Sequence, residues 1–255
     1  MDSRWDAVGA SRGTVALLHG VGSSAATWWR VGPALAEHGW DVVALDLPAH
    51  GDRPAPDESL TAELLADQIV AELPDGGVEL LVGHSLGGIV GAVIAARHPG
   101  VARAVVLEDP PGLGAVSPDV FAEVIAHDTE LAWDDPDRLA ARLRAVYPRW
   151  TDTDVQVVVG GLRCADADAV VGGLRAGLRW DVPALVGAAG CPVLVLAADE
   201  RGSALRDDER RAVEAALPPG RFIVLDGAHA LHRDQPDAWV TTVNDFGAGV
   251  GVTGR

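Results

Sequence analysis

Short, uniformly apolar runs recur along the chain, and helical stretches separate them. The runs are too uniformly apolar for a sheet with one wet face, which indicates strands buried on both faces of a parallel sheet. They fall at residues 14–18, 42–45, 78–82, 102–107, 193–197 and 222–225. The helical stretches cover residues 25–38, 60–73 and 89–98, and a glycine or proline follows each of them. This alternation predicts an α/β protein with a doubly wound, mostly parallel sheet.

The alternation is interrupted between the fourth and fifth runs. Apolar positions there follow helical spacing, as in Phe121, Val124 and Ile125. Because ligands bind at the C-terminal edge of the strands in open α/β folds, we expect these helices to cover that edge as a cap. The predicted division is a core of residues 1–111 and 191–255 with a helical cap insertion of residues 112–190.

Composition narrows the classes of partner and chemistry. The 255 residues, 48% of them hydrophobic, suffice for one sizeable core. A formal net charge of −17 disfavours nucleic acid and anionic membrane surfaces. The chain has no lysine, which excludes Schiff-base chemistry, and its cysteines, Cys164 and Cys191, lack the neighbours of a metal or redox site. We expect a small-molecule substrate, no cofactor and no metal.

The location is predicted from what the hydrophobic pattern lacks. No apolar run approaches the length of a membrane span. The first six residues are neither basic nor apolar enough to start a signal peptide. The expected location is therefore the cytoplasm.

A Gly-His-Ser-Leu-Gly-Gly segment at residues 83–88 points to catalysis. It lies between the apolar run 78–82 and the small-residue helical run 89–97, which is the strand, sharp turn and helix that a nucleophile elbow needs. Such a turn strains the serine backbone, and the three glycines remove bulk that would clash. Ser85 is thus the predicted nucleophile, and the amide of Leu86 at the helix N-terminus is one donor for an oxyanion. The alternative is a Gly-rich turn with an incidental serine.

Four motifs in chain order resemble those of the α/β-hydrolase superfamily, and the resemblance covers nearly the whole chain. They are residues 17–21 after the first strong strand, 46–51 after the next, the segment 83–88, and Gly227-Ala228-His229 after the last strand. The resemblance implies the α/β-hydrolase fold, with Ser85 as nucleophile, His229 as base and the amides of Val21 and Leu86 as oxyanion hole. Relatives usually begin with a longer antiparallel hairpin, so the short start here leaves an exposed sheet edge and the possibility of a homodimer.

Histidine must take the serine proton, because a serine hydroxyl is a poor nucleophile at neutral pH. His229 is preferred to His232 because it follows a small Gly-Ala turn directly after a strand. His19 belongs to the oxyanion loop and is expected to shape it. His84 occupies a variable position of the elbow.

The sequence offers more than one candidate for the acid that orients the histidine. Many relatives carry it after strand 7, where this chain reads Ala198-Asp199-Glu200-Arg201, with arginine at the usual acid position. Arginine cannot accept the imidazole N–H. A second location known in the superfamily is the end of strand 6, which corresponds here to Glu108-Asp109. Our order is Asp109, then Asp199, then Glu108; the alternative is that Glu108 and Asp109 merely end a strand in solvent.

Tryptophan is abundant, with eight residues. Trp28 and Trp29 follow the oxyanion loop and are candidates for the acyl pocket, while Trp133, Trp150 and Trp180 in the cap are candidates for a flat, apolar substrate site. The alternative is that they attach the cap to the core.

The predicted function is a cofactor-independent serine hydrolase. It would cleave a carboxylic ester or lactone of a small hydrophobic or aromatic substrate through an acyl-enzyme. Two alternatives stay open: a lyase, cyclase, acyltransferase or C–C-bond-cleaving enzyme on the same fold, and a ligand-binding receptor.

Overall fold

The computed structural model describes residues 3–112, 117–176 and 180–251 of the chain. Its centre is a sheet of seven strands, in the order β1-β3-β2-β4-β5-β6-β7. The strands are β1 (Ser3–Trp5), β2 (Thr14–Leu18), β3 (Asp41–Leu45), β4 (Leu80–His84), β5 (Val105–Glu108), β6 (Val193–Ala197) and β7 (Phe222–Val224). Neighbouring strands are parallel except that β1 runs antiparallel to β3. The mostly parallel, doubly wound sheet is as predicted, and the short β1 covers the edge of β3.

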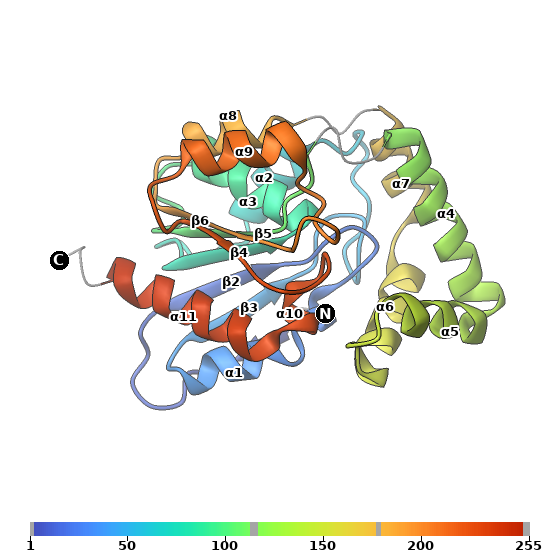
Figure 1. Ribbon diagram of the computed structural model, residues 1–255, viewed down its shortest axis with the longest axis horizontal. Coiled ribbons are helices and arrows are strands. Elements are labelled where there is room, and N and C mark those ends of the chain that lie inside the picture. Colours follow the sequence, from blue (N-terminus) through green and yellow to red (C-terminus); the bar gives the residue numbers. More distant parts are fainter. Residues whose placement is uncertain (1–2, 113–116, 177–179, 252–255) are drawn as a thin grey trace.

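Helices cover both faces of the sheet (Figure 1). One face carries α2 (Ala62–Val70), α3 (Leu86–Arg97), α8 (Val182–Gly187) and α9 (Asp207–Ala216). The other carries the 3-10 helix η1 (Ala25–Trp28), α1 (Val31–Glu37), α10 (Leu231–Asp234) and α11 (Pro236–Gly251). Two separate apolar clusters fill the space between the sheet and these layers.

One predicted helix is divided. The stretch 25–38 forms η1 and then α1, which restarts at Val31. Pro33 explains the break, because its ring in a continuous helix would clash with the carbonyl of Trp29 and its nitrogen could not donate to it. In α1 this proline lies in the first turn, where no intrahelical donor is needed.

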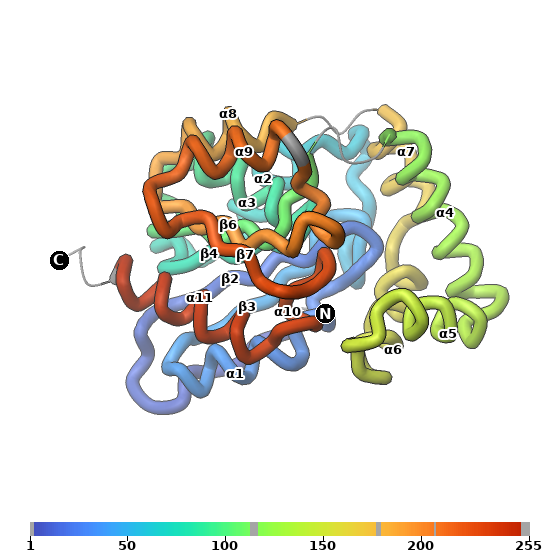
Figure 2. The backbone as a smooth tube through the Cα atoms, in the orientation of Figure 1, coloured from blue at the N-terminus to red at the C-terminus, as the bar shows by residue number. Residues whose placement is uncertain are grey.

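A group of four helices lies beside the C-terminal edge of the strands (Figures 1 and 2). They are α4 (Pro118–Asp134), α5 (Pro136–Val146), α6 (Asp152–Cys164) and α7 (Ala167–Ala176). An apolar cluster of their own holds α4, α5 and α6 together. Helix α8 falls inside the predicted insertion 112–190, yet it packs against α3 and α9 on the face of the sheet. The elements over the site are therefore α4–α7, which we call the cap. Within the described residues, no helix has the length and apolarity of a membrane span.

Candidate active site

Ser85 lies in a sharp turn between β4 and α3. Its backbone has φ 52° and ψ −115°, in the region that favours glycine, so the residue is strained. Two hydrogen bonds hold it there: the Ser85 amide donates to the Glu108 carbonyl at 2.9 Å, and the Ile89 amide donates to the Ser85 carbonyl at 3.0 Å. The turn thus has the conformation of a nucleophile elbow.

The glycines around Ser85 are required by close backbone approach. A Cβ on Gly83 would lie 2.1 Å from the Gly87 carbonyl oxygen, and one on Gly87 would lie 2.3 Å from the Leu18 carbonyl oxygen. Backbone atoms cannot move aside as a flexible side chain can. The sequence pattern and the strained turn therefore have one cause, the passage of β2 and α3 against the elbow.

His229 and Asp109 come together from two different loops. Nδ1 of His229, after β7, lies 2.6 Å from Oδ2 of Asp109, which directly follows β5. The same carboxylate accepts hydrogen bonds from Ala198 N at 3.1 Å, Ser203 Oγ at 2.6 Å and Ala204 N at 2.8 Å. Burial alone would raise the pKa of Asp109, but its hydrogen bonds, first of all that from His229, lower the pKa below the ordinary value. Asp109 is therefore an anion at neutral pH.

The contact with Asp109 determines which nitrogen of the His229 imidazole carries the proton. A carboxylate can only accept, so Nδ1 carries the hydrogen and Nε2 is left as an acceptor. The His229 side chain is 33% exposed. It borders a cavity of about 220 Å³ together with Ser85, and we call this the Ser85 cavity. Its other walls include Val21 of the oxyanion loop and the cap residues Phe121, Ile125 and Trp150.

The other acid candidates lie elsewhere. Oδ1 of Asp199 accepts the amides of Arg201 at 2.9 Å and Gly202 at 3.0 Å, which makes it the cap of a local turn. Glu108 points to the opposite side of its strand from Asp109, because successive side chains of a strand alternate. Of the three candidates, Asp109 is the one that hydrogen-bonds to His229.

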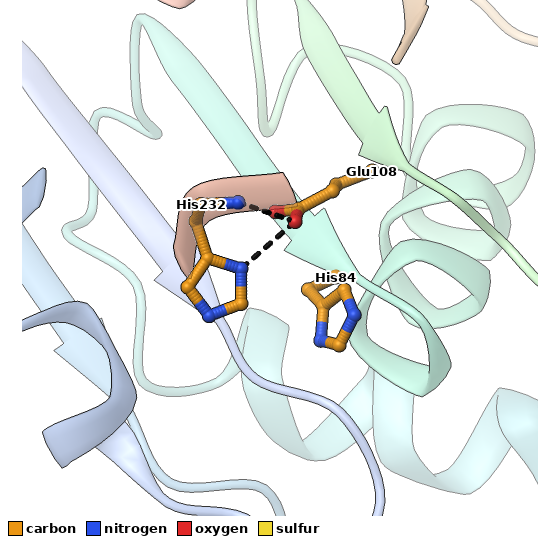
Figure 3. Close-up of side chains that lie close together, drawn as sticks. All are labelled: His84, Glu108 and His232. Carbon is orange, nitrogen blue, oxygen red and sulfur yellow. Dashed lines mark hydrogen bonds and ion pairs between the residues drawn. The ribbon is translucent and has the colours of Figure 1, made fainter. Parts of the chain in front are cut away.

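Glu108 instead hydrogen-bonds to His232, and the ring of His84 lies beside this buried pair (Figure 3). Its Oε1 accepts from N and Nδ1 of His232 at 3.0 and 2.8 Å, and its Oε2 accepts from Trp239 Nε1 at 3.0 Å. Burial raises the pKa of Glu108 and lowers the pKa values of both histidines. The potential ligand atoms of the three residues lie within 4.8 Å of one another. Since hydrogen bonds already occupy both Glu108 oxygens, we assign no metal to this cluster.

His84 contributes more than the sequence indicated. Its Nε2 lies 3.1 Å from the carbonyl oxygen of His229, and a carbonyl only accepts, so Nε2 donates. The two rings also pack, with centroids 4.7 Å apart. The elbow therefore holds the histidine loop through its own neighbouring residue. Nothing in the sequence pairs these positions, which are 145 residues apart.

Two buried histidines shape the oxyanion loop. Nε2 of His19 accepts the amide of Leu47 at 2.9 Å, and Nε2 of His50 accepts the amide of Gly22 at 3.1 Å. Burial lowers the pKa of His19 to about 3 and also lowers that of His50, so both rings are neutral at pH 7. This places His19 in the shaping role predicted for it. His50 was missed, because in sequence it is one more loop histidine.

Val21 and Leu86, the predicted oxyanion donors, flank the elbow from two sides. Val21 follows β2 and borders the Ser85 cavity. Leu86 is the first residue of α3, where amides have no intrahelical acceptor. Their amide roles remain a prediction.

The five predicted substrate tryptophans have different surroundings, and only Trp150 borders the Ser85 cavity. Trp28 is fully buried against His232 and Trp239 in the core, since η1 turns its ring inward. Trp133 is 62% exposed and contacts the Arg163 guanidinium, and it does not border the Ser85 cavity. The expectation of substrate contact is corrected for both of these residues.

Trp29 and Trp180 attach the cap to the core. Nε1 of Trp29 donates to Oδ1 of Asp154 in α6 at 3.1 Å. Nε1 of Trp180 donates to the carbonyl oxygen of Pro111 at 2.6 Å. Neither ring borders the Ser85 cavity, so the attachment role that the sequence left open describes them better than substrate binding.

A family model described as alpha/beta hydrolase family matches residues 15–242. The chain belongs to this family. It is 30% identical over 254 residues to a pimeloyl-[acyl-carrier protein] methyl ester esterase of Aromatoleum aromaticum, covering 93% of this chain and 91% of that protein. A protein of the same description from Neisseria meningitidis is 30% identical over 249 residues, or 92% and 77% of the two chains.

Solved structures show the same fold. E-2-(acetamidomethylene)succinate hydrolase superposes with a TM-score of 0.81 at 22% identity, over 96% of this chain and 93% of that one. The enol-lactonase from Burkholderia xenovorans LB400 superposes with a TM-score of 0.73 at 23% identity, over 96% and 95%. Together with the family match, these comparisons confirm the predicted superfamily, fold and enzyme class, an esterase-like hydrolase.

Proposed function

We propose that this hydrolase cleaves a carboxylic ester or lactone through an acyl-enzyme formed on Ser85. The observation that carries the proposal is the 2.6 Å contact between His229 and Asp109 beside a cavity that Ser85 also borders. A strained serine, a histidine with an acceptor nitrogen and a buried carboxylate are the groups that nucleophilic acyl transfer requires. The esterase relatives are consistent with this chemistry.

The first half of the reaction forms the acyl-enzyme. Ser85 Oγ attacks the carbonyl carbon while His229 Nε2 takes the hydroxyl proton. The negative charge that moves to the carbonyl oxygen is stabilised by the amides of Val21 and Leu86. The imidazolium formed in this step is stabilised by Asp109, which stays ionised. Collapse of the intermediate breaks the ester C–O bond, and His229 returns the proton to the leaving alcohol.

The second half releases the acid. Water attacks the acyl carbon, and His229 Nε2 accepts a proton from it. When the bond to Ser85 Oγ breaks, that proton passes to the serine and the free acid leaves. With a lactone the alcohol stays attached to the acyl chain, so one hydroxy acid leaves after the second step. A cavity of about 220 Å³ suits a small acyl group.

The decisive experiment is labelling with a fluorophosphonate followed by intact-protein mass measurement. We expect one adduct on the wild-type protein, none on Ser85→Ala, and a normal adduct on Ser117→Ala, which changes an exposed serine of the cap. In parallel, wild type and Ser117→Ala are expected to hydrolyse p-nitrophenyl butyrate, and Ser85→Ala is not. Hydrolysis of this ester that survives Ser85→Ala would overturn the acyl-enzyme on Ser85 and favour direct attack by water.

A further inference from the structure

A buried cation borders the Ser85 cavity and takes no part in the reaction described above. Arg233 in α10 is only 6% exposed and is one of the cavity's wall residues. Its Nη2 donates to Thr27 Oγ1 at 2.5 Å, and its guanidinium carbon lies 4.6 Å from the centre of the Trp150 ring. The guanidinium therefore lies between the core, through η1, and the cap.

Arg233 has no direct anionic partner in the described part of the chain, where no carboxylate oxygen lies within 4 Å of it. The carboxylates of Asp154, Glu108 and Asp234 act on its charge only at longer range. Asp154 is engaged by Trp29, and Asp128, another wall residue, forms an ion pair with Arg142. Burial lowers the pKa of Arg233 to about 10, so the guanidinium still carries its charge at neutral pH.

Hydrogen-bond donors without acceptors gather around the same cavity. Nε of Arg233, Nε1 of Trp150 and the hydroxyl of Ser23 are each buried without a hydrogen-bond partner among the described residues, and all three residues border the cavity. Oδ1 of Asp128 is a further wall atom of this kind, but it is an acceptor and forms an ion pair with Arg142. A buried donor that stays unpaired is destabilising, so such groups are rarely left unpaired without a reason. Two of these three groups can only donate, and a ligand that suits them supplies acceptors.

We propose that the Ser85 cavity binds esters that carry a carboxylate, with Arg233 as the residue that recognises it. The inference rests on the function proposed above and specifies its substrate class: the ester of an acid that has a second, ionised group. One cation without a direct partner balances one negative charge, which favours a carboxylate over a doubly charged phosphate. Because the chain's net charge of −17 repels anions at long range, local pairing with Arg233 has to supply the selectivity.

A purely structural role for Arg233 makes a different prediction. If the guanidinium only joined Thr27 to Trp150, its loss would affect charged and uncharged substrates alike. If it pairs with substrate, its loss affects charged substrates selectively. The charge of the substrate is therefore the variable to change.

The experiment compares monomethyl esters of succinic, adipic and suberic acids with the corresponding dimethyl esters, by kcat/KM. The proteins are wild type, Arg233→Met, Arg233→Lys and the control Arg144→Met, which removes an exposed arginine of the cap. We expect wild type to prefer at least one monoester. Arg233→Met should reduce kcat/KM for that monoester by about 10- to 100-fold and change the diester much less. Arg233→Lys should recover part of the loss, and Arg144→Met should behave as wild type.

Binding separates this proposal from the proposed function. Calorimetric titration of Ser85→Ala with the monoester requires no turnover, and adding Arg233→Met to it should weaken binding by a similar factor. If wild type hydrolyses no ester while this binding difference holds, the proposed function fails and the carboxylate site stands. If monoester and diester bind with equal affinity, the carboxylate site is overturned. It is also overturned if Arg233→Met melts like wild type and its kcat/KM falls by the same factor for both esters. Should Arg233→Met fail to fold, the uncharged Arg233→Gln gives the answer: a monoester-to-diester ratio of kcat/KM equal to that of wild type would overturn the carboxylate site, and a lower ratio would support it.

Discussion

Replacing Asp109 with asparagine removes one charge from the most heavily hydrogen-bonded side chain of the site. The carboxylate accepts four hydrogen bonds, from His229, Ser203, Ala204 and Ala198. An amide has one oxygen and one NH2 group in the same space. If the NH2 group takes the place of Oδ2, this donor faces the N–H groups of both His229 and Ala204, which are donors too. If the amide is reversed, the NH2 group faces the Ala198 N–H, while the Ser203 hydroxyl can turn to accept from the NH2 group.

The expected loss of kcat differs between the two orientations of the amide. The first one leaves the Ala204 amide unpaired and drives His229 to the tautomer with hydrogen on Nε2, which cannot take the Ser85 proton. Loss of the correct tautomer in a serine hydrolase costs about 10⁴-fold in kcat. The second orientation keeps the tautomer but loses the charge that stabilises the imidazolium, for which we expect about 10²-fold, or about 2.7 kcal/mol of transition-state stabilisation. Either orientation also leaves at least one buried N–H unpaired, at about 1–3 kcal/mol of stability.

The assay is the steady-state hydrolysis of p-nitrophenyl butyrate, with Asp199→Asn as the matched control. Both variants change one aspartate of the two candidate acid loops, but Asp199 accepts only the amides of its own turn. We expect kcat to fall by about 10²- to 10⁴-fold for Asp109→Asn and to change little for Asp199→Asn. Near wild-type kcat in Asp109→Asn, with a large loss in Asp199→Asn, would refute the assignment.

Four further predictions concern acid stability, the elbow, a helical glycine of the cap and the histidine loop. Burial raises the pKa of Asp109, but its hydrogen bonds outweigh this and leave it below 3.8 in the folded state, so its stabilisation is present above pH 3.8 and is lost as pH falls through the folded pKa. The difference in melting temperature between wild type and Asp109→Asn should therefore shrink as pH falls below 3.8; a constant difference would contradict this. Gly83→Ala forces a Cβ against backbone 2.1 Å away and should destabilise by about 3 kcal/mol or more in urea unfolding. Gly160→Ala, a helical position with nothing within 4 Å, should stabilise by about 0.5–1 kcal/mol. His84→Ala removes the donor to the His229 carbonyl, so kcat should fall about tenfold with KM nearly unchanged, whereas a rise in KM alone would indicate substrate contact instead.

The elbow could be predicted because its determinants are local. The glycines at 83 and 87 are needed where backbones meet, and they stand within a few residues of Ser85, between an apolar strand and a helix. His229 was recognisable for a similar reason, since it follows the last strand of a parallel sheet and parallel strands end at the same edge. Apolar runs located the strands to within a few residues, because burial on both faces leaves a continuous apolar signal.

Contacts between distant segments could not be read from the chain. Glu108 and Asp109 are adjacent acids at a strand end, and only the register of β5 decides that Asp109 meets His229 while Glu108 meets His232. A shift of one residue would exchange their faces. The contacts of the tryptophans could not be predicted either, because helical spacing does not indicate which residue a ring will contact.

The sequence by itself thus determined the family and the fold, and it was enough to predict Ser85 as nucleophile and His229 as base, because each depends on short-range sterics or on strand order. The tertiary structure decided which acid faces the histidine, which histidines brace the loops, and that Arg233 borders the cavity without a direct anionic partner. These contacts join segments that are not neighbours in the chain, 28 residues apart for His50 and Gly22, 120 for His229 and Asp109, and 145 for His84 and His229, and no local pattern of residues records such distances.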